Sequence, residues 1–495
     1  MNIYIWAIAI YLAVMIAISV YKSRQVKTQD DFMVAGRGVT WMFLVGTLVC
    51  SWIGSGSLFG GAGRAFRGGF SALWMSAGAW VGIAIVYFLA PKVRRIAKYT
   101  VPDILEMRYT PAARVLGTFA IIIAYLTIAG YQFIGGGKLL NILTGIDPKV
   151  GIGLVCGLVI LYTVLAGMTS IVALDVINGT MILIGIVIAA PFALKAAGGW
   201  GGLTETLPAT HFTVTGSTGI AAALGLFLPT FFLLLGESGM YQKFMSAKNE
   251  WHARTAVIGM IVGVIVIEVI LDSVAIFGAG ALWDNPAFRA ADGSLDRAAT
   301  ETVILEMGAN HLPVFAGILL LIGAAAIIFS TANTFLMVPS TNLTRDIYQR
   351  FINPDAGEKR VIMVQRSMIV VLALAALVLT TQFENILDMA LYAYTMVGAA
   401  VTPVLLAAFL WRRVTPLAGT ASVAVGVIST IVFALLANAG VEHLNLGFAS
   451  MPLDYDYIIY PAGTLSILTL VIGSYLTPRS SEDKWRPFWA AEDAG

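Results

Sequence analysis

The stretch TLVCSWIGSGSLFGGAGRAF, residues 47–66, places five glycines between Gly54 and Gly63 inside a hydrophobic segment that is long enough to cross a membrane. Each glycine inside a helix disfavours that helix by about 1 kcal/mol relative to alanine. In lipid, a broken backbone is tolerated only where protein buries it or where it lines a water-filled cavity. Freed carbonyl groups can then hold a cation. We therefore predict a discontinuous transmembrane helix at a substrate and ion site. The alternative is a closely packed helix with small residues at its interface.

The composition of the 495-residue chain is that of a polytopic membrane protein. Hydrophobic residues make up 58% and charged residues 12%, whereas charged residues make up about 25% of soluble domains. The two cysteines, Cys50 and Cys156, lie in apolar runs, and the four histidines have no metal-ligand spacing, so we expect no disulfide framework. Because we find no Walker A motif and no soluble catalytic domain, we do not expect an enzyme, a nucleic-acid partner or an obligate protein partner.

Hydropathy predicts an all-α protein with about thirteen transmembrane helices, because a span needs about 20 mostly apolar residues. The predicted spans are 3–21, 42–66, 70–90, 113–145, 151–167, 170–196, 219–246, 255–284, 311–344, 361–381, 386–411, 416–438 and 457–477.

The distribution of basic residues predicts the orientation of the chain. With the N-terminus outside, most of the 30 Lys and Arg residues fall in loops and a tail that are cytoplasmic, as the positive-inside rule requires. The long loops 197–218, 285–310 and 439–456 are poor in Lys and Arg and fall outside. The tail 478–495 is then cytoplasmic.

A weak internal symmetry is visible in the positions of helix-breaking residues. The seventh span carries GESG at 236–239, five helices after the glycine-rich second span. Paired interruptions in corresponding positions are typical of transporters built from two repeats, with a site at the midplane. The predicted parts are the first helix and loop at 1–41, five-helix repeats at 42–196 and 219–411, an extracellular loop at 197–218 between them, and two peripheral helices at 412–477.

Polar residues within the spans indicate a cation site. Asp175 lies about five residues into a span, and a carboxylate at the centre of a membrane helix costs roughly 2.5–3.5 kcal/mol. It is either a cation ligand or a structural partner for a hydroxyl or a helix end. Ser330 and Thr331 offer two hydroxyl oxygens, with the carbonyl of Ile327 one turn earlier, and hard oxygen ligands suit alkali cations. Hydrogen bonding of these hydroxyls to their own helix is the alternative.

Three further acids lie in predicted spans. Glu237, at the second interruption, either attracts a cationic substrate group or a proton, or pairs with Lys138 or Lys243. Glu268 and Asp272 lie on one helix face at spacing i, i+4. They either take part in ion coupling or only approach the outer interface.

Aromatic, amide and small polar residues near the two interruptions are candidates for a pocket that binds a small polar organic solute. The candidates are Trp52, Ser55, Gly56, Phe59, Trp74, Tyr131, Gln132, Glu237, Ser238, Tyr241, Gln242 and Tyr394. For any single aromatic residue, packing or anchoring at the membrane interface is the alternative role.

Four stretches of the chain resemble the sodium:solute symporter family. They are SWIGSG at 51–56, QFIGGGKLLNILTGID at 132–147, YTVLAGMTSIVALDVING at 162–179 and FSTANTFLMVPSTNLTRDIY at 329–348. The resemblance covers nearly the whole chain. It implies an inverted five-helix-repeat fold of the amino-acid/sodium symporter type, located in a bacterial plasma (inner) membrane. It also implies alternating access, in which inward sodium flow drives solute uptake. It does not identify the solute.

The resemblance also implies a sodium site between the first broken helix and the eighth helix of the core. Its ligands would be the carbonyl groups of Cys50, Ile53 and Ile327 and the hydroxyl groups of Ser330 and Thr331. Asp175 matches a family carboxylate close to that site. Some members bind a second sodium, which would fall here at Asn333 and Thr334.

These observations predict a sodium-coupled secondary active symporter that imports a small polar organic solute. Its partners are the solute, Na⁺ as the co-transported ion and the lipid bilayer. A proton-coupled transporter of the same fold is the first alternative, and it would use Asp175, Glu237, Glu268 or Asp272. A solute channel or a sensor is the alternative from another class, although the tail 478–495 leaves little room for the signalling domain expected of a sensor.

Overall fold

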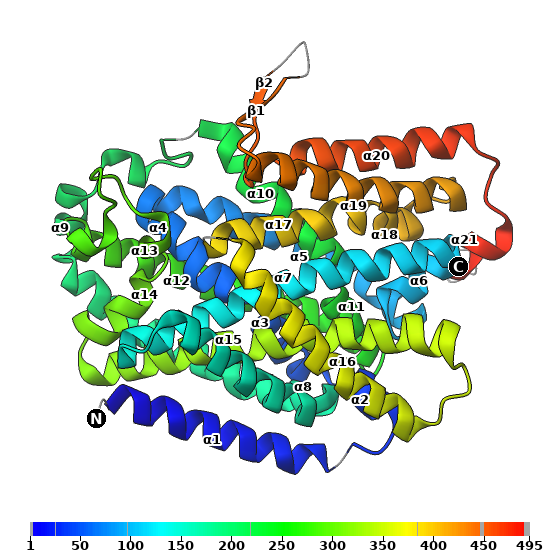
Figure 1. The fold of residues 1–495 in the computed structure, drawn as a ribbon, viewed down its shortest axis with the longest axis horizontal. Helices are drawn as coiled ribbons and strands as arrows, with labels where there is room; N and C mark the ends of the chain where they lie inside the picture. The colour runs from blue at the N-terminus through cyan, green and yellow to red at the C-terminus, as the bar shows by residue number, and fades with distance from the viewer. Residues whose placement is uncertain are drawn as a thin grey trace.

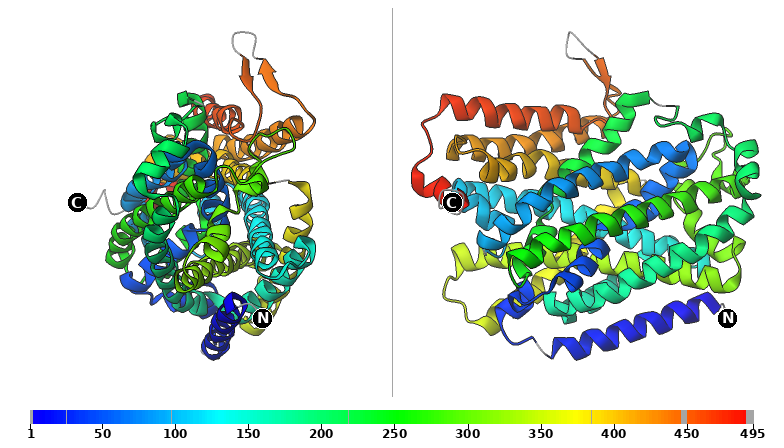
Figure 2. Two further views of the ribbon diagram at one scale, coloured as in Figure 1. Left: turned by 90° about the vertical axis from the view of Figure 1, so that its left-hand side faces the viewer. Right: turned by 180° about the vertical axis from the view of Figure 1, so that it is seen from behind.

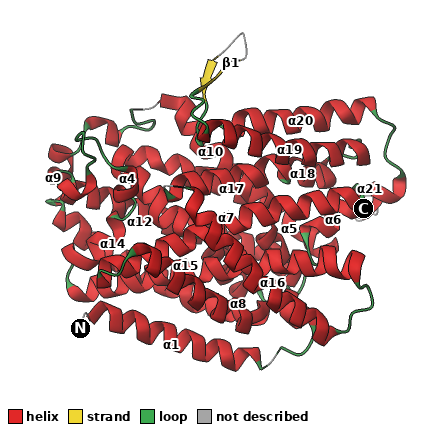
Figure 3. Ribbon diagram, viewed as in Figure 1, coloured by secondary structure: helices red, strands yellow, loops and turns green. Residues whose placement is uncertain are grey.

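The protein folds into a bundle of long helices that run side by side (Figures 1 and 3). The computed structural model describes residues 3–24, 26–96, 98–217, 219–383, 385–445 and 450–489. In these ranges the only strands are β1 (His443–Asn445) and β2 (Ser450–Pro452), which pair antiparallel with Leu444 opposite Met451. The predicted all-α membrane fold is therefore confirmed, apart from this short hairpin in an expected loop.

The elements are numbered in chain order, with η for short 3₁₀ or π segments. The helices are α1 (Ile3–Ser23), α2 (Gln29–Val34), η1 (Ala35–Arg37), α3 (Trp41–Trp52), η2 (Gly56–Gly61), α4 (Ala62–Gly68), η3 (Gly69–Ala72), α5 (Leu73–Ile96), α6 (Val101–Arg108), α7 (Pro111–Thr144), α8 (Pro148–Ala196), α9 (Gly199–Thr206), η4 (Ala209–Phe212), α10 (Gly219–Gly236), α11 (Ser238–Ser246), α12 (Glu250–Leu282), η5 (Pro286–Phe288), α13 (Arg297–Thr300), α14 (Val303–Glu306), η6 (Met307–His311), α15 (Val314–Asn342), η7 (Leu343–Ile352), α16 (Glu358–Leu379), η8 (Thr380–Gln382), α17 (Ile386–Ala400), α18 (Thr402–Leu410), α19 (Pro416–Asn438), α20 (Ile459–Leu476) and α21 (Glu482–Trp489).

Within the described ranges, twelve helical segments are long and apolar enough to cross a membrane. One of them, Gly56–Ile96, turns at Gly69, whose φ of 61° and ψ of −142° are not helical. Its first part therefore continues the short apolar helix α3 rather than α5. Counting this interrupted helix as a crossing of its own accounts for the predicted thirteen. The start of α1 and the end of α21, the first and last described helices, lie at opposite ends of the bundle (Figures 1 and 2), as an odd number of crossings requires.

The outside of the bundle is apolar, as expected for a protein in lipid. Large hydrophobic side chains stand exposed along the helices, among them Phe88, Val378 and Leu476. Burial is greatest in the spans 386–410, 111–144 and 314–352, and least in α1, which lies against α8 and α15 at the edge (Figure 1). The core of the protein is therefore formed by α7, α15 and α17.

Two helices are broken at corresponding points, as predicted. The first break separates α3 from η2 at Ile53, which has an extended backbone with φ −74° and ψ 107°. The second separates α10 from α11 at Glu237, with φ −67° and ψ 103°. A long helix also reverses within α8 at Gly167, where φ is 63°. The boundaries of the two repeats remain a prediction.

Candidate functional site

The first broken helix turns freed carbonyl groups toward α15. The Thr331 hydroxyl donates a hydrogen bond to the carbonyl oxygen of Ile53 at 2.9 Å and a longer one, of 3.5 Å, to that of Cys50. The Ser330 hydroxyl donates to the carbonyl of Ile327 at 3.3 Å, which is the back-bonding arrangement. All five residues are buried. The residues expected to bind sodium therefore lie together between the two helices.

Gly54 allows this close approach. A Cβ atom at Gly54 would lie 3.0 Å from the side chains of both Gln132 and Thr331, which is tighter than ordinary van der Waals contact. Gln132 in turn accepts hydrogen bonds from the backbone N–H of Ser55 at 3.0 Å and from its hydroxyl at 2.6 Å. The break is thus held from one side by α15 and from the other by α7.

Asp175 binds a lysine as well as a hydroxyl. Its carboxylate accepts a hydrogen bond of 2.5 Å from Thr47 and lies 3.6 Å from the ammonium of Lys243. That ammonium also donates to the backbone carbonyl of Thr47, at 2.9 Å, and to the hydroxyl of Ser51. Lys243 is fully buried. Lys243 was expected to pair with Glu237 or to count among the cytoplasmic basic residues, although any ionisable residue within a span is a candidate functional group.

The residues expected at a second sodium position lie next to this cluster. The hydroxyl oxygen of Thr334 is 3.3 Å from that of Ser51. Asn333 is buried, and its side-chain oxygen has no hydrogen-bond partner among the described residues.

Glu237 caps a helix, and the predicted alternative of an ion pair is wrong. Its carboxylate accepts hydrogen bonds from the N–H groups of Gly239 and Met240, at the start of α11, and from the hydroxyl of Tyr125. Lys138 pairs instead with Glu301 at 2.8 Å, while Lys243 pairs with Asp175. In the described part of the chain no basic group lies within ion-pair distance of Glu237. The carboxylate is satisfied by helix N–H groups, as at other helix N-termini.

A small polar cavity lies against the same broken helix. It is lined by Trp52, Ser57, Gly61, Ala72, Met75, Ser76, Thr230, Glu268, Asp272 and Tyr394. Glu268 accepts hydrogen bonds from the indole N–H groups of Trp52, at 3.0 Å, and Trp80, at 2.8 Å. Among the described residues, the hydrogen bond to Asp272 is a weak one, of 3.4 Å, from Ser76. Both acids therefore face the interior, and the alternative that they only approach the outer interface is wrong. The closed cavity has room for about one water molecule.

Several other residues expected to line the pocket are buried near the two breaks. Tyr131 and Tyr394 meet beside the break, with their hydroxyl oxygens 3.5 Å apart. A Cβ atom at Gly56 would lie 2.5 Å from the Tyr394 hydroxyl, so any other residue here would require the Tyr394 side chain to move. Phe59 is buried on the same segment, with the Lys138 ammonium 6.0 Å from its ring. Ser238 is also buried, and its hydroxyl has no partner among the described residues.

The remaining three lie away from the cavity. Trp74 donates to the backbone carbonyl of Val214 at 2.8 Å and lines a separate open groove. The hydroxyl of Tyr241 donates to the carbonyl of Leu235, and the amide of Gln242 donates to the carbonyl of Met33. The side chains of Trp74, Tyr241 and Gln242 thus form hydrogen bonds to the protein's own backbone. Residue type alone could not predict the direction in which each side chain points.

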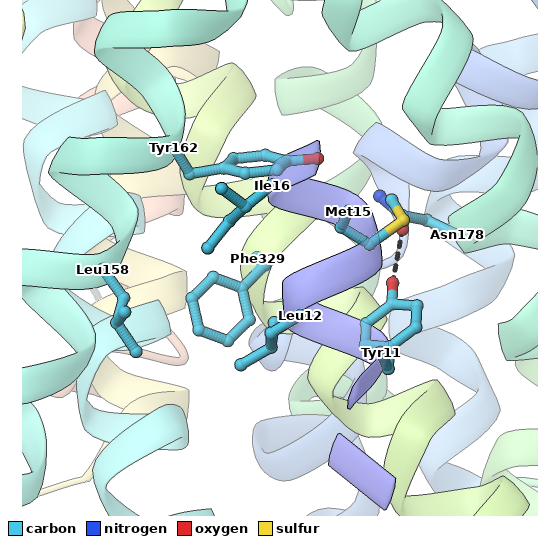
Figure 4. A pocket seen from close by; sticks show the side chains of 8 residues that line it. All are labelled: Tyr11, Leu12, Met15, Ile16, Leu158, Tyr162, Asn178 and Phe329. Atoms are coloured by element: carbon cyan, nitrogen blue, oxygen red, sulfur yellow. Dashed lines mark hydrogen bonds between the residues drawn. The ribbon is translucent and has the colours of Figure 1, made fainter. Parts of the chain in front are cut away.

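A second, mostly apolar pocket lies between α1, α8 and α15 (Figure 4). Its lining residues are Tyr11, Leu12, Met15, Ile16, Leu158, Tyr162, Asn178 and Phe329. Inside it the hydroxyl of Tyr11 donates to the side-chain oxygen of Asn178. This pocket is not lined by the broken helices and offers few polar groups to a solute.

Comparison with known proteins places these features in context. A profile of the sodium:solute symporter family matches residues 32–426. The high-affinity proline transporter PutP of Bacillus subtilis is 25% identical over 493 residues, which cover 94% of this chain and 97% of that protein. The sodium/pantothenate symporter of Escherichia coli is 26% identical over 480 residues, 94% of each protein.

Solved structures share the fold at low sequence identity. An outward-open, substrate-bound Na⁺-coupled sialic acid symporter superposes with a TM-score of 0.79 at 17% identity, covering 97% of this chain and 99% of that one. MHP1, a nucleobase-cation-symport-1 family transporter, gives 0.57 at 13% identity, covering 92% and 97%. The inverted-repeat transporter fold is confirmed, and the relatives are transporters rather than enzymes. With paired broken helices, a cluster of buried oxygen groups and a family profile that spans most of its length, this chain belongs to the sodium:solute symporter family.

Proposed function

We propose that this protein imports a small polar organic solute together with sodium, and that sodium binds between α3 and α15. The proposed ligands are the carbonyl oxygens of Cys50, Ile53 and Ile327 and the hydroxyl oxygens of Ser330 and Thr331. The observation that carries the proposal is that the Thr331 hydroxyl already lies 2.9 Å from the Ile53 carbonyl and 3.5 Å from the Cys50 carbonyl. A cation entering here would take over oxygen atoms that now face one another.

Sodium at this place would stabilise one conformation of the transporter. The ligands come from two separate elements, the break after α3 and the middle of α15. A ligand shifts a conformational equilibrium only by its difference in affinity for the two states. Because the oxygen atoms converge only when the two elements are close, bound sodium favours the state in which they stay together. We propose that this is the outward-open, substrate-competent state.

Replacing Ser330 or Thr331 by alanine tests the sodium site. Each variant removes one hydroxyl ligand, so we expect the sodium concentration for half-maximal uptake to rise about tenfold or more, equivalent to about 1.4 kcal/mol or more, with little loss of thermal stability. Uptake of a radiolabelled solute into proteoliposomes across a sodium series measures this. Ser340→Ala is the matched control, because Ser340 donates to its own helix at Met337 as Ser330 donates at Ile327. Unchanged sodium activation in both site variants would contradict the proposed ligands.

We place the solute beside the sodium site, in the cavity formed by Trp52, Glu268, Asp272 and Tyr394. These residues combine aromatic surface with hydrogen-bonding groups, which suits a small polar solute. The relatives named as proline and pantothenate transporters support an organic solute. Because the cavity is closed and small, solute entry requires α5 or α12 to move away from the broken helix.

Proton coupling is the second candidate, and the acid pair is the observation that favours it. Glu268 and Asp272 are buried in the cavity wall, and no Lys, Arg or His lies within ion-pair distance of either among the described residues. Burying an unpaired charge is costly, so these groups would take up a proton or a cation. Uptake in sodium or potassium at one fixed pH, followed by a pH series without sodium, separates the two candidates.

For the orientation we propose an extracellular N-terminus and a cytoplasmic C-terminus in a bacterial inner membrane. The basic residues support this, because Arg114 and Arg350 bind Glu106 of α6 and Arg412 lies over the ring of Trp485 in α21, and α6 and α21 lie at the end of the bundle away from the start of α1 (Figure 1). Fusion of a reporter enzyme that is active only in the cytoplasm to the C-terminus tests the proposal. Activity supports it, and lack of activity in a stably expressed fusion would reverse it.

A further inference from the structure

The environment of Lys243 is built for a cation. An ammonium group has three hydrogen-bond donors and no acceptor, and three oxygen atoms surround this one. They are a backbone carbonyl from Thr47, a hydroxyl from Ser51 and a carboxylate from Asp175. A carbonyl, a hydroxyl and a carboxylate are also the oxygen ligands that bind hard metal cations. The side chain is fully buried, so water does not supply these contacts.

One of the groups that binds the ammonium also lies beside α15. Ser51, which accepts a hydrogen bond from Lys243, lies 3.3 Å from the Thr334 hydroxyl. The neighbouring Asn333 keeps a buried side-chain oxygen with no partner in the described ranges. Oxygen groups of α3 and α8 therefore surround one positively charged group that is covalently part of the protein, and a hydroxyl of α15 lies next to one of them.

Charge balance limits what else can bind beside Asp175. No second carboxylate among the described residues lies within ion-pair distance of Lys243; Glu237 interacts with it only at longer range and is itself bound by N–H groups of α11. At contact distance one negative charge therefore faces one positive charge. A sodium ion entering the same cluster would bring two positive charges to a single carboxylate in a buried site, where such repulsion is weakly screened. Asp175 is therefore already neutralised before any ion enters.

We propose that the Lys243 ammonium occupies the cation position between Asp175, Ser51 and Thr334, so that this transporter couples a single sodium ion to each solute. This proposal rests on the proposed function, because it concerns the number of sodium ions that accompany each solute. Lys243 belongs to α11, whereas its acceptors belong to α3 and α8. The tethered cation thus also joins the second broken helix to the first.

Counting bound ions tests the proposal directly. Equilibrium binding of ²²Na⁺ to the purified full-length protein should give one ion per molecule. Lys243→Met removes the charge while keeping an unbranched side chain that is only one atom shorter, so we expect a second ion, and a Hill coefficient of sodium activation that rises from near one toward two. Lys243→Arg keeps the charge and should keep one ion. The double variant Asp175→Asn with Lys243→Met removes the carboxylate that the second ion needs, and should return to one.

Lys138→Met is the matched control, because it removes a different interior lysine, paired with Glu301, and should leave the count at one. Two ions in the unmodified protein, or one ion in folded Lys243→Met, would overturn the proposal. If Lys243→Met does not fold, the count in the unmodified protein decides. Absence of any saturable sodium binding in the unmodified protein would instead mean that sodium coupling itself fails.

Discussion

At the scale of single residues, the site depends on how closely backbone and side chains approach each other at the first break. The Thr331 hydroxyl can reach the Ile53 carbonyl because residue 54 has no side chain. The glycine pattern predicted that the helix breaks here. The partners of the break could not be predicted from local pattern, since Thr331 and Lys243 come from distant parts of the chain. The polar pattern identified Thr331 as a possible cation ligand, but only the family resemblance placed it beside the break, and nothing paired Lys243 with Asp175.

We expect Gly54→Ala to weaken sodium binding more than folding. The added methyl group would lie 3.0 Å from both Gln132 and Thr331, so it would push Thr331 away from the freed carbonyls, at a stability cost of about 1–3 kcal/mol for overpacking. Thermal unfolding with and without sodium measures both effects. Gly157→Ala is the control, because a methyl group there meets nothing within 4 Å. An equal loss of sodium affinity in the control would contradict the steric explanation.

At the scale of elements, the segment from η5 to α14 forms a cover at the end of the bundle that holds the N-terminus (Figure 1). Glu301, in this cover, accepts hydrogen bonds from the N–H groups of Ile386 and Leu387, at the start of α17, each at 3.0 Å. It also pairs with Lys138 of α7. One carboxylate thus joins the cover to two core helices. The sequence predicted only a loop here, because a carboxylate that caps a distant helix leaves no local signature.

Weakening this contact should open this end of the transporter, which is the outer side in the proposed orientation. Hydrogen bonds to a charged group contribute about 1.5–3 kcal/mol each, so Glu301→Gln should raise the labelling rate of a cysteine at Ser57, in the cavity wall, about tenfold. The background lacks Cys50 and Cys156, and a membrane-impermeant thiol reagent reports the rate. Glu205→Gln changes an exposed acid at the same end of the bundle and should have no effect. A rate unaffected by Glu301→Gln would show that the cover is held by other contacts.

At the scale of the whole molecule, polar contacts also close the opposite end of the bundle. Arg114 of α7 binds Asp103 and Glu106 of α6 and Asp346 of η7, and Arg350 binds Glu106 at 2.7 Å. Burial alone would raise the pKa of Glu106, but hydrogen bonds from Arg350 and Arg114 outweigh it and hold this pKa below its ordinary value. The number of spans followed from hydropathy and the first break from the glycine pattern, while the orientation read from the basic residues stays a prediction. This network could not be predicted, because its members are distant in sequence.

The lowered pKa of Glu106 gives stability a defined pH dependence. Its contribution is complete above the ordinary glutamate pKa of about 4.3 and is lost as pH falls through the lower value in the folded protein. We expect the unmodified protein to have a higher melting temperature than Glu106→Gln at neutral pH. The difference in unfolding free energy should be less than about 1 kcal/mol, because Arg350 is half exposed. The difference should vanish in acid. Glu482→Gln, which alters an exposed pair with Arg486, should show no such convergence.

The proposed sodium site also has a consequence for how the gene can vary. Three of its five proposed ligands are main-chain carbonyl groups, and every amino acid carries that group. A codon change at Cys50, Ile53 or Ile327 therefore leaves the ligand atom in place. Selection against such a change depends only on whether the new side chain preserves the shape of the break. Sequence drift at these positions can be extensive while ion binding is inherited unchanged. Inheritance of the site then depends on the two hydroxyl positions and on the residues that keep the helix open.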